Sequence, residues 1–328
     1  MKNFLIKTIW NINTGSLPVF VSGSPRSGTT WIMEVLERAT ASRIHWEPLN
    51  WYLYQQGHSR FAGEQYALRP DAELLAEDEA YSRELKRVLS GGSPIVASSA
   101  KIAKLSTLDN MARIFTANNT IIKFVFAQRA LSWIAENSEN NGCVILRHPA
   151  AIVASQLHHP YKRNGEITPH PEWTKEVIEK THPIYTEMDL KRFPTLKNVL
   201  AMELSSAGRL AVTACLDLLN ALHSETARDN YTYVVYESLI KQPGKFEQLI
   251  ESLGLQIKHN LSLADIEERS RTTSLQSKKS PKGTQRLSEV ERVEITSIMK
   301  NLGIDYYNHE MEFVEAGLKG MNFSKLIS

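Results

Sequence analysis

The chain has 328 residues, of which 42% are hydrophobic and 23% are charged, a balance typical of a globular protein. The formal net charge of +2 gives no support for a nucleic-acid-binding protein, although it is compatible with a local basic site for an anionic ligand. No stretch approaches the roughly 18 uncharged apolar residues of a transmembrane helix. The first residues lack the apolar core and the cleavage site of a signal peptide. Cys143 and Cys215 lie in apolar segments, so we expect buried free thiols in a reducing compartment.

The first predicted elements enclose a loop rich in glycine and serine. Residues 19–21 predict a strand, and residues 29–39 predict a helix with one apolar face. Such a loop is an anion site, because the free N–H groups of the first helical turn point at the ligand. Gly23 and Gly28 have the spacing of the phosphate-binding loop of NTPases, but Thr29 and Thr30 replace its Lys and Ser/Thr. The cation is Arg26, whose planar fork can hold two oxygens of a phosphate or sulfate; the alternative is a tight turn with a solvated Arg.

The remaining chain alternates between strands and helices. We predict further strands at residues 43–48, 94–97, 120–126, 143–146 and 231–236. Further helices are predicted at residues 71–89, 104–117, 130–136, 150–157, 172–180, 196–223, 243–253 and 288–302. Residues 49–70 and 271–286 predict loops, as do residues 158–195 around their short helix. The alternation, without an internal repeat or a linker, indicates a single α/β domain over residues 1–328 with a central parallel sheet.

A second cation follows the predicted strand 143–146. Arg147 leaves this strand at its carboxyl end, where α/β folds bind ligands. Ser155 follows about two helical turns later, so both residues reach one phosphate if the strand end lies beside that helix. The alternative is an Arg that caps a strand and an unrelated helical Ser.

The segment from Pro25 to Trp31 resembles the 5′-phosphosulfate-binding loop of the sulfotransferases, which use 3′-phosphoadenosine-5′-phosphosulfate (PAPS). An Arg at position 26 resembles the tyrosylprotein, carbohydrate and many bacterial members, whereas the cytosolic members usually carry Lys there. The segment from Arg147 to Ser155 is similar to the family's 3′-phosphate motif. The resemblance spans roughly residues 17–305 and implies a P-loop-like three-layer fold, with a central parallel sheet flanked by helices.

The resemblance also assigns residues to the cosubstrate. Tyr236 stands where the family has a Tyr that borders the adenine, and Trp31 stands where it has a stacking aromatic; the alternatives are a rim aromatic and helix packing. Lys282 and Gly283 resemble a segment that closes over the 3′-phosphate, although Pro281 replaces its Arg and a solvated loop Lys is the alternative. The implied cosubstrate-binding residues are Arg26, Ser27, Gly28, Thr29, Thr30, Trp31, Arg147, Ser155, Tyr236, Lys282 and Gly283.

Sulfuryl transfer needs a base for the acceptor hydroxyl and cations for the charge on the bridging oxygen. Beside Arg26, Lys123 is a candidate cation, because it interrupts an apolar run and stands as far before the 3′-phosphate Arg as the catalytic Lys of cytosolic sulfotransferases. The His that those enzymes carry two positions later is Val125 here. Glu47 is the favoured base, since tyrosylprotein and carbohydrate sulfotransferases place a Glu similarly, and His45 is the alternative base. The non-catalytic interpretation of Glu47 is a surface strand end or an ion pair with Arg26.

Together these residues predict a sulfotransferase that moves the sulfuryl group from PAPS to a hydroxyl of a small-molecule, carbohydrate or lipid acceptor. One alternative is a nucleotide or small-molecule kinase, which would need the missing loop Lys and an Asp that holds Mg²⁺. The other is a non-catalytic nucleotide-binding protein. No cluster has metal-ligand spacing, so we expect no metal. Golgi carbohydrate sulfotransferases normally carry a membrane anchor, so we expect a cytoplasmic relative; the acceptor and the oligomeric state cannot be read from the sequence.

Overall fold

The computed structural model describes residues 17–47, 71–91, 117–163, 166–170, 173–242, 244–258, 283–308, 312–318 and 320–328. The predicted loop 49–70, the predicted strand 94–97, almost all of the predicted helix 104–117 and most of the predicted loop 271–286 lie outside the described residues. Lys282 lies outside them as well.

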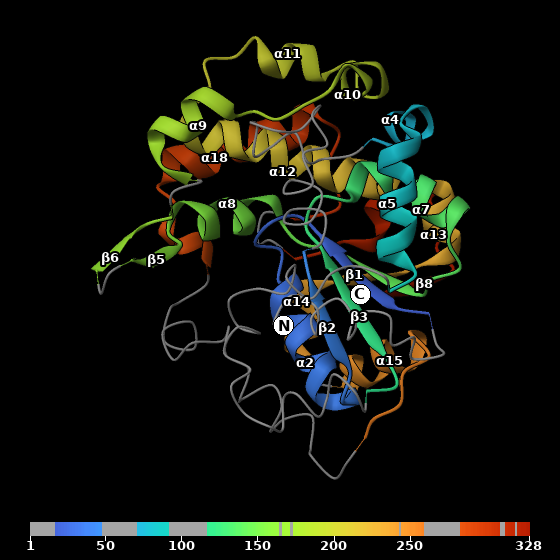
Figure 1. Cartoon of the computed structure of the whole chain (residues 1–328). Helices are drawn as coiled ribbons and strands as arrows, with labels where there is room; N and C mark the ends of the chain where they lie inside the picture. The colour runs from blue at the N-terminus through green and yellow to red at the C-terminus, as the bar shows by residue number, and fades with distance from the viewer. Residues whose placement is uncertain are drawn as a thin grey trace.

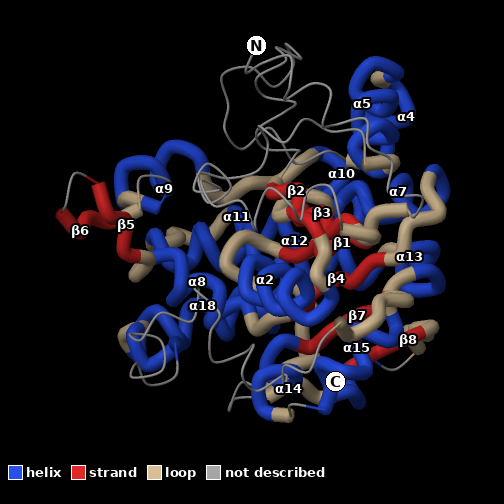
Figure 2. Tube along the Cα trace, turned by 60° about the horizontal axis from the view of Figure 1, so that its bottom comes forward, coloured by secondary structure: helices blue, strands red, loops and turns tan. Residues whose placement is uncertain are grey.

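Six strands form one sheet in the order β2-β3-β1-β4-β7-β8, and every neighbouring pair is parallel (Figure 2). The central strands are continuous apolar runs that are buried along their whole length, which is the pattern of a parallel sheet covered on both faces. The strands are β1 Val19–Gly23, β2 Arg43–Trp46, β3 Thr120–Phe124, β4 Gly142–Leu146, β7 Thr232–Val235 and β8 Lys325–Ile327.

Alternate residues of each strand enter two separate cores. Phe20, Ile122 and Val144 are buried on one face, whereas Val21 and Cys143 are buried on the other, as the two-residue period of a strand requires. The first face is covered by α5 Glu79–Leu89, α7 Leu131–Asn137, α8 Pro149–Leu157, α12 Ser206–His223 and α18 Glu289–Asn301, and the second by α2 Thr29–Thr40 and α15 Gly244–Ser252 (Figure 1). Helices therefore flank both faces of the sheet, which confirms the predicted three-layer α/β fold.

Two predicted helices are each divided in the structure. The predicted helix 71–89 is split into α4 Ala72–Glu77 and α5, because Asp78 accepts a hydrogen bond from Tyr81 N–H and starts a new helix. The predicted helix 196–223 is split into α11 Leu196–Leu200 and α12, because Ser205 caps α12 by accepting from Gly208 N–H at 3.1 Å. Gly208 is thus part of a helix start and not of a helix interior.

The structure also contains elements that the sequence analysis did not predict. A hairpin of β5 Pro160–Arg163 and β6 Glu166–Pro169 lies in the predicted loop 158–195, and so does α10 Glu187–Arg192. The short helix predicted within this loop at residues 172–180 is present as α9 Lys175–Thr181. Strand β8 extends the main sheet from the carboxyl-terminal tail. Tyr236, predicted as the end of a strand, is the first residue of α14 Tyr236–Lys241.

A buried ion-pair network ties the helices of the first face together. Arg129 donates from both Nε and Nη2 to the carboxylate of Asp189, with the shortest bond 2.7 Å long. Asn220 Nδ2 donates to the same carboxylate at 2.7 Å. The carboxylate is fully buried, and these contacts hold its pKa below the usual range against the opposing effect of burial. Such a network fixes α10 against α12.

The two cysteines are buried free thiols, as the sequence predicted. Burial raises the pKa of Cys143 to about 12 and raises the pKa of Cys215 as well. Both side chains are therefore protonated and inert at neutral pH.

Candidate active site

The carboxyl ends of the parallel strands meet at one edge of the sheet, and the residues singled out from the sequence lie there. The loop after β1 is central, because β3 and β4 flank β1 on its two sides. Lys123 is in β3, Arg147 follows β4, and Tyr236 follows β7. The chain crosses from β3 to β4 over β1, so the loop lies at the topological switch point, where open α/β sheets bind ligands.

The loop between β1 and α2 is a tight turn in which Ser27 N–H donates to the carbonyl of Ser24 at 2.9 Å. Arg26 and Gly28 have left-handed backbone conformations, with φ of 73° and 101°. A side chain at Gly28 would collide with the ring of Tyr236, because a Cβ there would lie 2.2 Å from Cε2. The buried Ser27 hydroxyl has no hydrogen-bond partner among the described residues. The first turn of α2 likewise receives no side-chain cap from any described residue. The loop therefore offers donors to an anion.

Arg26 and Arg147 meet across this loop. Arg147 Nη1 donates to the main-chain carbonyl of Arg26 at 2.6 Å, and Arg26 Nε donates to Ser155 Oγ at 3.2 Å. The last turn of α8 also holds the loop, since Gln156 Nε2 donates to the carbonyl of Pro25 at 3.3 Å. The sequence grouped Ser155 with Arg147, whereas the structure bonds it to Arg26. The two predicted anion sites thus form one cluster.

The environment of Arg26 disfavours its positive charge. Burial, and next the repulsion from Arg147, lower the pKa of Arg26 to about 10. Tyr236 and Glu47 act in the opposite direction, and their effects are smaller. An anion bound beside the two guanidinium groups would offset both the desolvation and the repulsion.

Aromatic rings form the base of the cluster. The Arg147 guanidinium lies 4.4 Å from the ring centroid of Tyr236, and Trp31 meets Tyr236 and Phe246 edge-on at 6.1 and 5.6 Å between centroids. Trp31 is only 7% exposed, so this packing favours the helix-packing interpretation of its role over a stacking surface for adenine. In the first turn of α2, Thr29 is buried and Thr30 is half-buried.

Lys123 and Glu47 form a buried ion pair, in which Lys123 Nζ donates to Glu47 Oε1. Their side chains are 3% and 15% exposed. Glu47 follows the end of β2 and has a left-handed backbone, with φ of 45°. This turn directs its carboxylate towards the Lys in β3 and does not follow the alternation of the strand. The pair lies near Arg26, and the Glu47 charge partly opposes the lowering of the Arg26 pKa.

His45 lies on the other face of the sheet. The register pairs His45 with Ile122, and Lys123 with the next residue of β2, so His45 and Lys123 belong to opposite faces. His45 is 5% exposed, and burial, followed by the charge of Arg43, lowers its pKa to about 3. An imidazole with this pKa is a weak base.

Gly283 opens the 3₁₀ helix η4 Gly283–Arg286, which packs against α8. Gly283, the last residue of the segment that resembles the 3′-phosphate closure, therefore belongs to a short helix that packs against the helix carrying Ser155. Lys282 itself lies outside the described part of the chain.

Two histidines near Arg26, which pack against a tryptophan, were assigned no role from the sequence. His159 follows α8, its ring stacks on His170 at 5.3 Å between centroids, and His170 lies 4.5 Å from Trp173. Burial, and next the charge of Arg26, lower the pKa of His159 to about 4 and lower that of His170. The hairpin β5–β6 brings the two histidines together. Its signal in the sequence is the dipeptide Asn164-Gly165, which is typical of a two-residue hairpin turn.

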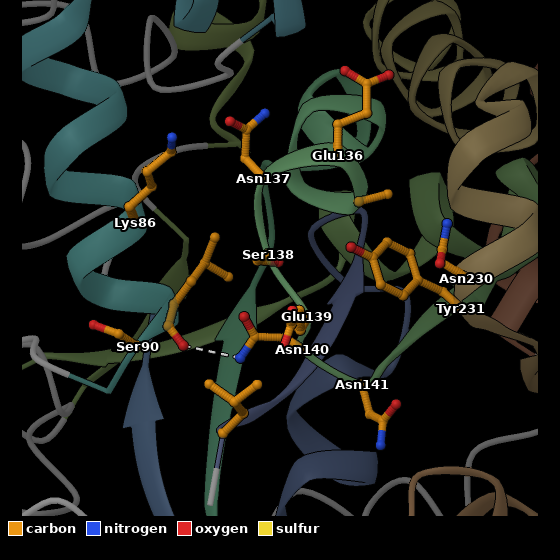
Figure 3. Close-up of a pocket in the computed structure, with 13 residues that line it drawn as sticks. Lys86, Ser90, Glu136, Asn137, Ser138, Glu139, Asn140, Asn141, Asn230 and Tyr231 are labelled. Carbon is orange, nitrogen blue, oxygen red and sulfur yellow. Dashed lines mark hydrogen bonds between the residues drawn. The ribbon is translucent and has the colours of Figure 1, made fainter.

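A separate cavity lies at the opposite, amino-terminal edge of the sheet (Figure 3). Its polar lining includes Asn137, Asn140 and Asn141, whose side-chain amides donate to the carbonyls of Trp133, of Pro18 and Leu89, and of Leu253, respectively. These amides are therefore already engaged in bonds within the protein, and Lys86 is the one cation among the described residues that line the cavity. The carboxyl edge remains the candidate site.

The described residues hold neither a membrane-spanning helix nor a metal-binding cluster. No helix among them is long and apolar enough to cross a membrane. No group of three or more His, Cys, Asp and Glu side chains in the same part of the chain could hold a metal ion.

Three comparisons with known proteins bear on the family to which the chain belongs. A family model described as "Sulfotransferase domain" matches residues 17–316. Among solved structures, the sulfotransferase domain from the curacin biosynthetic pathway matches with 16% sequence identity and a TM-score of 0.37, over 88% of this chain and 99% of that chain. A comparison with curated proteins found no match. Because the family model covers most of its residues, the chain belongs to the sulfotransferase domain family.

Proposed function

We propose that this sulfotransferase uses PAPS as its sulfuryl donor and a hydroxyl of a small-molecule, carbohydrate or lipid acceptor, with the whole site in a single domain over residues 1–328. The observation that carries the proposal is the contact between Arg26 and Arg147 at the switch point of the sheet. This hydrogen bond, from the Arg147 guanidinium to the main-chain carbonyl of Arg26, holds two like charges near each other, since Arg147 lowers the pKa of Arg26. A ligand with several negative charges would stabilise such a pair. PAPS has anions at both its 5′ and 3′ positions.

In the proposed reaction the acceptor oxygen attacks sulfur in line with the bridging oxygen of the 5′-phosphate. The new oxygen–sulfur bond forms as the bond from sulfur to the bridging oxygen breaks, and the acceptor proton passes to the Glu47 carboxylate. The products are a sulfate ester and 3′-phosphoadenosine 5′-phosphate (PAP). Arg26 and Lys123 stabilise the charge that develops on the bridging oxygen.

The ion pair between Lys123 and Glu47 supports this division of roles. It keeps a base and a cation together in a buried place near Arg26. When Lys123 turns towards the leaving oxygen, the Glu47 carboxylate becomes available to accept the proton of the acceptor hydroxyl. His45, on the opposite face and with a pKa of about 3, is the weaker candidate.

A kinase is the rival that shares this fold. Its phosphate-binding loop needs a Lys after the second glycine, and that position is Thr29, which is buried. The cation of this loop is Arg26, which suits a phosphosulfate as well as a phosphate. The arrangement therefore favours sulfuryl transfer.

A binding experiment and a turnover experiment test the proposal. Calorimetry should show that PAP binds far more tightly than AMP, because AMP lacks the 3′-phosphate. A screen of hydroxylated acceptors with labelled PAPS should then give a labelled sulfate ester. Equal affinities for PAP and AMP, or transfer from labelled ATP in place of PAPS, would refute the assignment.

A further inference from the structure

The residue after Tyr236 ties two elements of the site together. Glu237, in the first turn of α14, accepts a hydrogen bond on Oε1 from the main-chain N–H of His148 at 3.0 Å. His148 in turn accepts from Ala150 N–H on Nδ1 at 3.0 Å and so caps α8. Glu237 therefore fixes the peptide unit that directly follows Arg147.

Glu237 occupies a place where a carboxylate is costly. Its second oxygen, Oε2, is buried and has no hydrogen-bond partner among the described residues. Burial raises the pKa of Glu237, and the nearby Arg147 and the N–H of His148 act against that rise. Arg147 Nε is likewise buried and has no hydrogen-bond partner among the described residues. A carboxyl group at such a buried position is costly, so it indicates a function beyond packing.

We infer that Glu237 is a positioning residue for Arg147, and that its hydrogen bond to His148 N–H sets the selectivity of the site for a 3′-phosphate. The inference rests on the proposed function. The bond anchors the Arg147–His148 peptide, so the Arg147 side chain starts from a fixed backbone and remains on the ring of Tyr236. Without this anchor, the guanidinium group would lose its orientation towards the phosphate, and the 5′ end of the nucleotide would bind as before.

Two variants of similar size separate the hydrogen bond from the charge. Glu237→Gln removes the charge and keeps a carbonyl oxygen at the distance of Oε1. Glu237→Asp keeps the charge and withdraws the oxygen from His148 N–H by one methylene. We expect Glu237→Asp to weaken PAP binding about tenfold or more, since a displaced Arg147 would lose a hydrogen bond to the charged 3′-phosphate, and to leave AMP binding within about twofold. Glu237→Gln should keep the wild-type ratio of the two affinities within about threefold.

The ratio of PAP to AMP affinity, measured by calorimetry, is a readout that general destabilisation does not change. Asp189→Asn is the matched control, because it alters a buried carboxylate that bonds Arg129 and Asn220, neither of which is assigned to the site. It should lower the melting temperature and leave the ratio unchanged. In an Arg147→Ala background, Glu237→Asp should have no further effect on the ratio, because the residue acts through Arg147.

The outcomes distinguish the two proposals. If wild type binds PAP and AMP equally, the proposed function fails and the role of Glu237 falls with it. If wild type discriminates and Glu237→Asp discriminates equally, only the role of Glu237 is refuted. A loss in Glu237→Gln as large as in Glu237→Asp would make charge the cause and overturn the hydrogen-bond argument. A further fall of the affinity ratio in the Arg147→Ala background would show that Glu237 does not act through Arg147, and would overturn its role as a positioning residue.

Discussion

Replacing Gly28 by Ala tests the packing at the centre of the site, and two costs add there. Gly28 has φ of 101°, and an L-residue with a left-handed backbone costs about 1–2 kcal/mol. The new Cβ would also lie 2.2 Å from Cε2 and 2.5 Å from Cδ2 of Tyr236, and relieving an overlap in packed surroundings costs about 1–3 kcal/mol. We therefore expect Gly28→Ala to lower the free energy of unfolding by about 2–5 kcal/mol.

Two other glycines make the measurement interpretable. Gly303 also has a positive φ, 73°, but no atom of the described residues beyond its two chain neighbours lies within 4 Å of the position that a Cβ would take. Gly303→Ala therefore reports backbone strain alone. Gly244, the first residue of α15, has neither a positive φ nor a close neighbour at the Cβ position. Gly244→Ala should therefore be neutral or stabilising. Urea unfolding followed by circular dichroism gives the free energy for all three variants. If Gly28→Ala costs no more than Gly303→Ala, the ring of Tyr236 does not fill the space beside the loop and the reasoning is refuted.

Three further outcomes test the site. Arg147→Ala should weaken PAP binding about 10- to 100-fold in calorimetry; an unchanged affinity would remove Arg147 from the site. Glu47→Gln, which can still accept from Lys123, should slow turnover roughly 10²–10⁴-fold with PAP affinity retained, and His45→Asn should matter much less; the reverse order would make His45 the base. Burial, and next Arg147, lower the pKa of His148 from 6.5 to about 4, so the unfolded state takes up a proton first and stability should fall as the pH drops from 6.5 towards 4. His148→Asn keeps a cap and should reduce that slope by about 1.4 kcal/mol per pH unit; an unchanged slope in urea unfolding would contradict the assignment.

Local signals in the sequence were sufficient for the elements that carry the cations. Continuous apolar runs predicted β1, β3, β4 and β7, and Ser288 with Glu291 predicted the start of α18, where the structure has a capping box. Arg26, Lys123 and Arg147 could be placed at one edge, because parallel strands end on the same side of a sheet. These inferences need only the residues within one element and its flanking turns.

Relations between distant segments could not be predicted in this way. Nothing near Ser155 in the sequence indicates that its hydroxyl accepts from Arg26, and nothing near Glu237 indicates its bond to His148. The two-residue period of a strand would place Glu47 on the same face as His45. The positive φ of Glu47 ends that period and directs the carboxylate to Lys123. Such contacts depend on how the strands pair and on where a strand stops.

The costs of the fold are concentrated where the proposed chemistry takes place. Arg26 and Glu47 have left-handed backbones, Lys123 is a buried cation, and Arg26 and Arg147 repel each other. Each of these features destabilises the folded chain, and the two apolar cores on either side of the sheet offset that loss. A packing role alone would be served better by neutral residues with ordinary backbones. Binding of an anionic substrate at the carboxyl edge of the sheet accounts for the strain and the like charges there. The positive charges that repel each other without the substrate are then the groups that bind it.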